Sequence, residues 1–199
     1  MRPADAAPRA HGSGAPRGIG APHSLEARVR HTLTHGAAPD AVARLVDGAV
    51  DADGLASAQH ALLAAAAQCA KEARTSPPAG GVRAECDARA LLLVHRVVCG
   101  RNEALAPAAV APAVSLVVDG LASEQVPVVR EALACVAALA QRNAKDLVAY
   151  WPALLAPESP ALTSCLAGAA RADAAHALGA LLTHGQGFWA MARDRYVCR

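Results

Sequence analysis

Aromatic side chains are scarce in this 199-residue chain, which has one Phe, two Trp and two Tyr, or 3% of its residues. Sheets depend on aromatic and β-branched residues, so this scarcity disfavours an aromatic-rich β-sandwich. No segment alternates between polar and apolar residues for long enough to predict a strand. The chain is rich instead in small residues, alanine above all, which suit closely packed helices.

An excess of charge is also missing, because 19 basic and 17 acidic residues leave a net charge of +2. This balance is too even to drive binding to nucleic acid or to an anionic membrane by charge alone. Long apolar runs are absent too, since Asp119 and Glu124 interrupt the best candidate, which begins at Leu105. We therefore expect no membrane span, and we regard nucleic acid as an improbable partner.

The chain also lacks the cysteine spacing typical of metal sites. It has six cysteines, and no two are arranged as CxxC. Cys69, Cys135 and Cys165 fall in apolar helical stretches, where a free cysteine behaves as a small hydrophobe. With no secretory signal, reduced thiols indicate an intracellular protein, cytoplasmic or nuclear. The N-terminus is rich in arginine and poor in acids, as in organellar targeting peptides, but its prolines prevent an amphipathic helix. Organellar targeting is therefore the less favoured alternative.

What the chain does have is an apolar pattern that returns every 42 residues. Each set falls at helical spacing: Ala90, Leu91, Val94, Val97 and Val98, then Ala132, Leu133, Val136, Leu139 and Ala140, then Ala174, Ala175, Leu178, Leu181 and Leu182. A buried helix face that recurs at this interval is typical of one half of a helix pair, stacked on copies of itself.

The pattern predicts an all-α fold, an α-α superhelix (a HEAT/ARM-like solenoid) of about four helix pairs. Residues 24–199 form this solenoid, with the best-defined repeats over 85–195, after a disordered Ala/Pro/Gly/Arg-rich tail over 1–23. Caps, prolines and glycines divide the solenoid into helices. The expected spans are 24–36, 39–48, 55–74, 82–99, 111–123, 127–143, 146–155, 159–167, 171–184 and a last short helix with Phe188, Trp189 and Met191.

Residues 114–140 resemble a HEAT repeat, with an apolar helix, a short turn and a second helix that begins at Pro127 and carries Arg130. In HEAT repeats an aspartate in the turn commonly pairs with that arginine. Here the turn reads Ser-Glu-Gln-Val, and Glu124 is the expected substitute. Over 85–195, the Tyr150-Trp-Pro segment and the Pro-bounded loop after it resemble the N-terminal domain of the HEAT repeat-containing protein six family.

This resemblance implies a noncatalytic protein-protein interaction scaffold that is part of a larger protein. The alternative is a transport or nucleic-acid-associated HEAT adaptor, which a basic stripe interleaved with aromatics would indicate. Arginines are present at 83, 89, 96, 101 and 130, but no aromatic residues are interleaved with them.

No catalytic, cofactor or metal residue is predicted. His31 and His35 have a zinc-helix spacing, but Thr32 stands where a hydrolase has glutamate and no third ligand is near in sequence. Cys86 and Cys99 are near Asp87 and His95, yet a helix interior offers no oxyanion hole. The glycines at 179, 185 and 187 lack the Lys-Ser/Thr of a phosphate loop and follow a helix, so they indicate a helix end. We therefore expect no enzyme activity.

One surface stripe is a candidate for partner binding. On the 127–143 helix, the face opposite Leu133 carries Arg130, Ala134, Ala137 and Gln141, and the 42-residue offset adds His95 and His176. In HEAT stacks this face lines the concave surface, so His95, Arg130, Gln141 and His176 are the possible contacts; a generic solvated face is the alternative. The aromatic pairs Tyr150-Trp151 and Phe188-Trp189 either fill the core or anchor a partner.

The tail gives the first testable prediction. In hydrogen exchange, amides before Ser24 should exchange without protection, because residues 1–23 cannot bury enough apolar surface to become ordered. Slow exchange in that segment would contradict the prediction.

Overall fold

The computed structural model describes residues 24–35, 39–75, 80–99, 103–155, 162–185 and 187. Within these ranges every regular element is helical, which confirms the predicted all-α class. The α-helices are α1 (Leu25–His35), α2 (Pro39–Asp53), α3 (Leu55–Thr75), α4 (Gly80–Cys99), α5 (Pro107–Leu121), α6 (Val126–Arg142), α7 (Ala144–Leu147), α8 (Trp151–Leu154) and α9 (Arg171–His184). Two short 3-10 helices, Val148–Tyr150 and Ser164–Ala167, precede α8 and α9.

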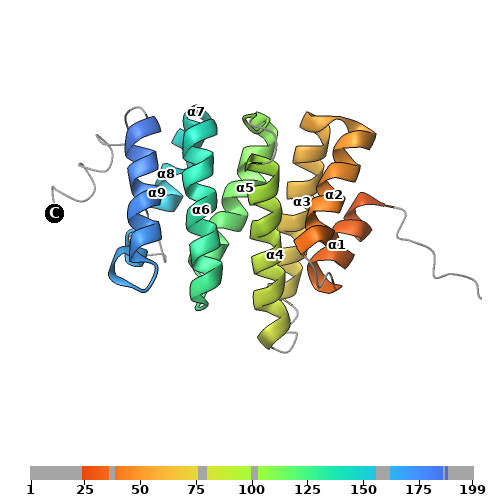
Figure 1. Ribbon diagram of the computed structural model, residues 1–199, viewed down its shortest axis with the longest axis horizontal. Helices are drawn as coiled ribbons and strands as arrows, with labels where there is room; N and C mark the ends of the chain where they lie inside the picture. The colour runs from red at the N-terminus through yellow and green to blue at the C-terminus, as the bar shows by residue number, and fades with distance from the viewer. Residues whose placement is uncertain are drawn as a thin grey trace, which may run out of the picture.

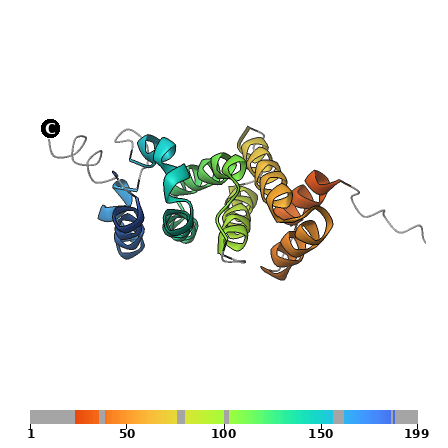
Figure 2. The same cartoon turned by 90° about the horizontal axis from the view of Figure 1, so that it is seen from above.

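The helices lie side by side in a row that is two layers deep (Figures 1 and 2). One layer contains α2, α4, α6 and α9 in that order, and each packs against the next. The other contains α3 and α5, with α8 beyond them, and α1 lies near α3 at the N-terminal end. The layers are joined where α3 packs on α4 and α5 packs on α6. Each long helix therefore has neighbours along the row and behind it.

The 42-residue pattern marks the buried face of the α4, α6 and α9 layer. All five positions are buried on α4 and again on α6. On α9, Ala174 and Leu181 are buried, Leu178 is half-buried, and Ala175 and Leu182 are exposed. The third copy is less covered because, among the described helices of this layer, only α6 flanks α9.

Small residues allow the layers to approach closely. Gly120, near the end of α5, is buried against α4 and α6, and a Cβ there would lie 2.6 Å from Leu91 Cδ1 and 3.1 Å from Ala132 Cβ. A Cβ at Gly120 would therefore force the Leu91 side chain and Ala132 to move, which shows how closely α5 approaches α4 and α6.

Several predicted boundaries agree with the structure. Ser24 caps α1, since its Oγ accepts a hydrogen bond of 3.1 Å from the Ala27 N–H. The spans of α3, α4, α6 and α9 agree to within a few residues. Residues 1–23, 156–161 and 188–199, which include Phe188 and Trp189, lie outside the described residues.

The predicted end of the second helix at Gly48 is wrong. The chain stays helical to Asp53 and turns at Gly54, whose φ is +78°, a conformation that costs glycine little. A glycine inside a helix costs only about 1 kcal/mol relative to alanine. Burial of Val46, Ala49 and Val50 on either side of Gly48 offsets that cost.

The predicted start of the fifth helix at residue 111 is also wrong, because α5 begins at Pro107 and passes through Pro112. Pro112 has no N–H for the carbonyl of Ala108, one turn earlier. His60 of α3 supplies a replacement, because its Nδ1 lies 3.0 Å from that carbonyl oxygen. A donor from a neighbouring helix therefore makes an internal proline tolerable.

Two predicted helices are more broken than expected. The span 146–155 is divided into α7, a 3-10 turn and α8, and Pro152 in α8 lacks the N–H that a continuous helix would use. Of the predicted helix 159–167, the described part is a 3-10 helix over Ser164–Ala167. The described chain between α6 and α9 therefore consists of short helices and turns.

Leu133 provides a test of the core. It is 1% exposed on α6, so Leu133→Ala should lower the free energy of unfolding by about 2–5 kcal/mol, the range for a deleted buried leucine. The matched control is Gln141→Ala on the exposed side of the same helix. This substitution should change the free energy of unfolding by less than ~0.5 kcal/mol. Urea denaturation measures both, and equal effects would contradict the packing described.

Candidate functional site

The candidate stripe lies on the α4, α6 and α9 layer, and two of its residues connect neighbouring helices. His95 on α4 faces Glu131 on α6, with Nδ1 3.0 Å from Oε1. Both side chains are partly exposed, at 39% and 31%. His95 therefore belongs to a polar contact between adjacent helices at the surface of the layer.

Arg130 makes the corresponding contact one step along the row. Its Nε lies 3.2 Å from Asp173 Oδ2 of α9, and an Nη donates to the Ala169 carbonyl at 3.3 Å. The expectation that Glu124 pairs with Arg130 is not met: Glu124 is exposed in the α5–α6 turn, and the carboxylate that pairs comes from the next helix.

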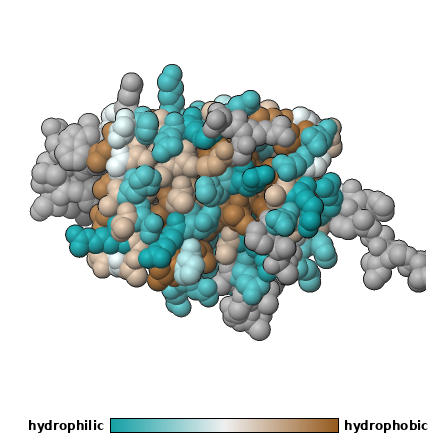
Figure 3. Space-filling view, in the orientation of Figure 1, coloured by the Kyte–Doolittle hydropathy of each residue, from teal (hydrophilic) through white to brown (hydrophobic). Residues whose placement is uncertain are grey.

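Gln141 and His176, the other two residues of the stripe, are exposed on α6 and α9. Ala137, which the helical pattern places between Arg130 and Gln141, is buried at 4% exposure, because α6 is flanked on both sides. The exposed face of α6 is therefore narrower than a regular helix projection predicts. Figure 3 shows this side of the molecule, with polar side chains scattered among weakly apolar ones.

A polar clamp between the layers was missed by the sequence analysis. Asn143 is 2% exposed; its Oδ1 accepts the Leu105 N–H at 2.9 Å, and its Nδ2 donates to the Leu105 carbonyl at 3.0 Å. Gln59 of α3 is 3% exposed, and its Oε1 accepts the Ala106 N–H at 3.1 Å. Together they hold the segment that leads into α5. The one signal in the sequence for this clamp was Asn143, a polar residue directly after an apolar helix.

A second polar group lies where α3, α4 and α5 meet. Arg74 Nη1 is 2.6 Å from Asp119 Oδ2, and Arg74 and Arg83 each approach Asp87 to 3.9 Å. Burial raises the pKa of Asp87, while Arg74 and Arg83 act in the opposite direction. Each acid faces a guanidinium, so the group fixes these helix ends and offers no free nucleophile or base.

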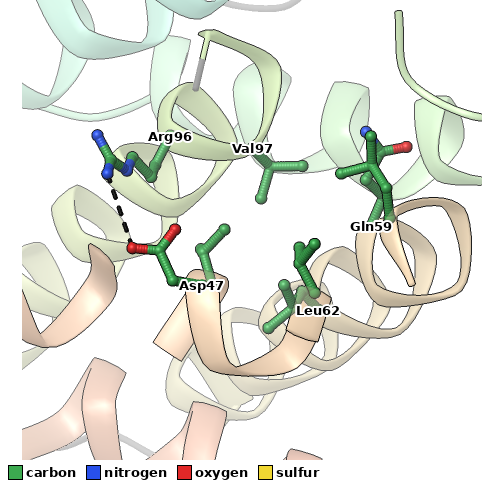
Figure 4. Close-up of a pocket in the computed structure, with 8 residues that line it drawn as sticks. Asp47, Gln59, Leu62, Arg96 and Val97 are labelled. Carbon is green, nitrogen blue, oxygen red and sulfur yellow. Dashed lines mark ion pairs between the residues drawn. The ribbon is translucent and has the colours of Figure 1, made fainter. Parts of the chain in front are cut away.

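An enclosed cavity lies between α2, α3 and α4 (Figure 4). Arg96 and Asp47, 3.9 Å apart, lie at one end, and Gln59 lies at the other. Its volume is about 40 Å³, which holds a few waters but is far below the several hundred Å³ typical of small-molecule sites. The cavity is therefore too small for a substrate.

The remaining candidates from the sequence form no metal or Cys/His catalytic site in the described residues. His31 and His35 stack with their ring centroids 5.2 Å apart, and no group of three His, Cys, Asp or Glu in the described ranges could hold a metal ion. Cys86 is 1% exposed inside the core. Trp151 is 3% exposed, in agreement with core filling, and Tyr150 is half-buried.

The arginines that could attract a polyanion are largely occupied. Arg83, Arg89, Arg96 and Arg130 each lie within 4.0 Å of a carboxylate, namely that of Asp87, Glu85, Asp47 or Asp173. Arg101 lies outside the described residues. None of the helices described here is long and apolar enough to cross a bilayer.

Comparison with protein-family models, with curated proteins and with solved structures found no match to this chain.

Asn143 provides the test of the polar clamp. Asn143→Ala would leave the Leu105 N–H and carbonyl without these partners, at a cost of about 1–3 kcal/mol for each group that stays unsatisfied. Lys145→Ala, two residues later and exposed, is the control. Urea denaturation of the two variants should differ by at least ~1 kcal/mol, and a difference within error would mean that the clamp contributes nothing.

Proposed function

We propose that this chain is a HEAT-like α-solenoid that serves as a noncatalytic scaffold for binding other proteins. One observation carries the proposal: residues 42 apart lie on successive helices of one layer, with the same apolar face buried on α4 and α6. Repeat proteins stack in this way, and they use the open face of one layer to bind partners.

The face we assign to the partner is the exposed side of the α4, α6 and α9 layer. His95 pairs with Glu131 and Arg130 pairs with Asp173, so these residues link adjacent helices at the surface of the layer. Gln141 and His176 are exposed and have room for a partner. Exposed polar contacts of this kind contribute at most about 1 kcal/mol each, so a partner could replace them at little cost.

A protein partner is favoured over a nucleic acid by the charges on the molecule. Nucleic-acid affinity comes largely from basic groups that neutralise phosphates, and a carboxylate beside such a group repels the phosphate. The four arginines named above already face carboxylates, and the chain carries a net charge of only +2. A surface of mixed polar and small side chains suits a protein surface better.

We propose a noncatalytic role because the described residues do not combine the groups that catalysis needs. The carboxylates at the α3–α5 junction face arginines, and the cavity between α2, α3 and α4 holds only about 40 Å³. In the larger α1–α3 groove, of about 680 Å³, the Glu72 carboxylate is paired with Arg30. Catalysis needs a held nucleophile or base beside a space for the reacting atoms. A scaffold needs only an exposed, shaped face.

The test compares two double variants of the full chain as bait. Gln141→Glu with His176→Glu adds two carboxylates to the proposed face. Ala111→Glu with Ser115→Glu adds two to the exposed side of α5 in the other layer. All four positions are exposed, so both variants should unfold within ~0.5 kcal/mol of the wild type. Proteins captured from cells are quantified by mass spectrometry, and one captured protein is then purified for calorimetry.

We expect the first variant to lose the partner, with the dissociation constant raised at least about tenfold, equal to 1.4 kcal/mol. The α5 variant should bind as the wild type does. Equal binding by both variants would exclude the assigned face. Capture that disappears after nuclease treatment would favour the nucleic-acid adaptor instead.

A further inference from the structure

Two free cysteines meet between the layers. Cys69 is on α3 and Cys86 is on α4, two helices that pack against each other. Their thiols interact directly at the α3–α4 contact. Cys69 is 6% exposed and Cys86 is 1% exposed. The two sulfur atoms are therefore neighbours in a place that excludes large reagents.

The two thiols differ in their access to solvent. Cys69 lies in the wall of an open groove of about 680 Å³ between α1 and α3, and Cys86 does not line it. The same groove is lined by Arg30, His60 and Glu72. Arg30 and Glu72 form an ion pair of 2.8 Å across it. A small uncharged oxidant can therefore approach Cys69 from the groove, whereas Cys86 lies in the core on the other side of Cys69.

The environment also shifts the pKa values of the two thiols in opposite directions. The hydrogen bond from Cys86 is the main cause that lowers the pKa of Cys69 to about 7, and Arg30 acts in the same direction against burial and Glu72. The pKa of Cys86 is raised, first by the same hydrogen bond and then by burial. Cys69, which faces the groove beside Arg30, is thus the nucleophile of the pair.

The other described cysteines lack these features. Burial raises the pKa values of Cys99, Cys135 and Cys165. Cys135 is fully buried, and its thiol donates to the Leu91 carbonyl at 3.5 Å. Cys165 is only half-buried, so access alone does not distinguish Cys69.

We propose that Cys69 and Cys86 form a hydroperoxide-reactive dithiol site, in which oxidation joins α3 to α4 by a disulfide. The Cys69 thiolate attacks the outer oxygen of a hydroperoxide, the O–O bond breaks, and hydroxide or alkoxide leaves with the electron pair. Cys69 becomes a sulfenic acid. The sulfur of Cys86 then attacks the sulfur of Cys69, and the sulfenic hydroxyl leaves with the Cys86 proton as water. Two thiols are oxidised and one hydroperoxide is reduced.

This site is independent of the proposed scaffold function. It depends on the α1–α3 groove and on the α3–α4 contact, whereas the partner face is the outer side of α4, α6 and α9. A disulfide between Cys69 and Cys86 would tie the two layers together at one point. The protein would then carry a redox-dependent link between its layers.

The experiment treats the folded full chain with hydrogen peroxide and maps the products by mass spectrometry after blocking the remaining thiols. Cys198, which lies outside the described residues, is replaced by Ser in every sample. We expect a Cys69–Cys86 disulfide to be the main product, at a rate at least about tenfold higher than oxidation of Cys165, a half-buried thiol without a low pKa. Dithiothreitol should reverse it.

Two variants separate the roles of the pair. In Cys86→Ala, Cys69 should accumulate as a sulfenic acid that dimedone traps, because the resolving thiol is gone. In Cys69→Ala, Cys86 should stay reduced. The control Cys135→Ala should still form the disulfide. Circular dichroism checks that each variant is folded. If a variant does not fold, the oxidation products mapped in the chain with both cysteines decide the proposal. Oxidation of Cys69 no faster than that of Cys165, or a disulfide with any other cysteine, would overturn the proposal.

Discussion

The whole arrangement depends on the burial of α6 from three sides. Along this helix Val128, Ala132, Leu133 and the run from Cys135 to Ala140 are all buried. Such close contact with α4, α5 and α9 is possible because most of these side chains are small, and because Gly120 lets α5 come near. Small residues reduce the apolar area per contact but allow helix axes to come closer together. The stability of the row therefore comes from many close contacts, and few large rings are needed.

The same constraint decides where polar chemistry can occur. Since the helices of this layer touch along their length, polar side chains are left at the seams, where His95 meets Glu131 and Arg130 meets Asp173. Inside, the few buried polar groups hold backbone, as Asn143 does for Leu105. The thiol pair lies at a different contact, between α3 and α4, and opens toward α1. The proposed partner face and the proposed redox site thus use different surfaces of the same row.

The sequence predicted those features of the fold that depend on repetition. The 42-residue interval identified equivalent buried positions on α4 and α6, and it was right only in part for α9, where Ala175 and Leu182 are exposed. The predicted helix boundaries were wrong where a single tertiary contact outweighs the local preference of a proline or a glycine. The prolines suggested that the fifth helix begins only at residue 111, but His60, far away in sequence, supplies the donor that the longer helix lacks at Pro112. Gly48 suggested an end, but the burial of its neighbours keeps the helix intact. Such contacts between distant residues leave no local signal.

The candidate stripe was partly predictable for the same reason. Helical projection placed Arg130 and Gln141 on the surface correctly, yet it also placed Ala137 there, because it takes no account of neighbours on both sides. The partner of Arg130 was misjudged, since the HEAT resemblance directed attention to Glu124 in the turn and not to Asp173 on the next helix. The Cys69–Cys86 pair could not be predicted at all, because the two cysteines are 17 positions apart and lie on successive helices.

The central claim is that α4, α6 and α9 follow one another in a single layer, with α6 between the other two. Methyl-methyl nuclear Overhauser contacts in solution test this most directly, with Leu and Val methyl groups labelled in the full chain. The account predicts contacts from Leu133 and Leu139 of α6 to methyl groups of α4 or α9, and none between Val97 of α4 and Leu181 of α9. A direct contact between Val97 and Leu181 would mean that the helices close into a bundle, and it would contradict the row on which the scaffold proposal rests.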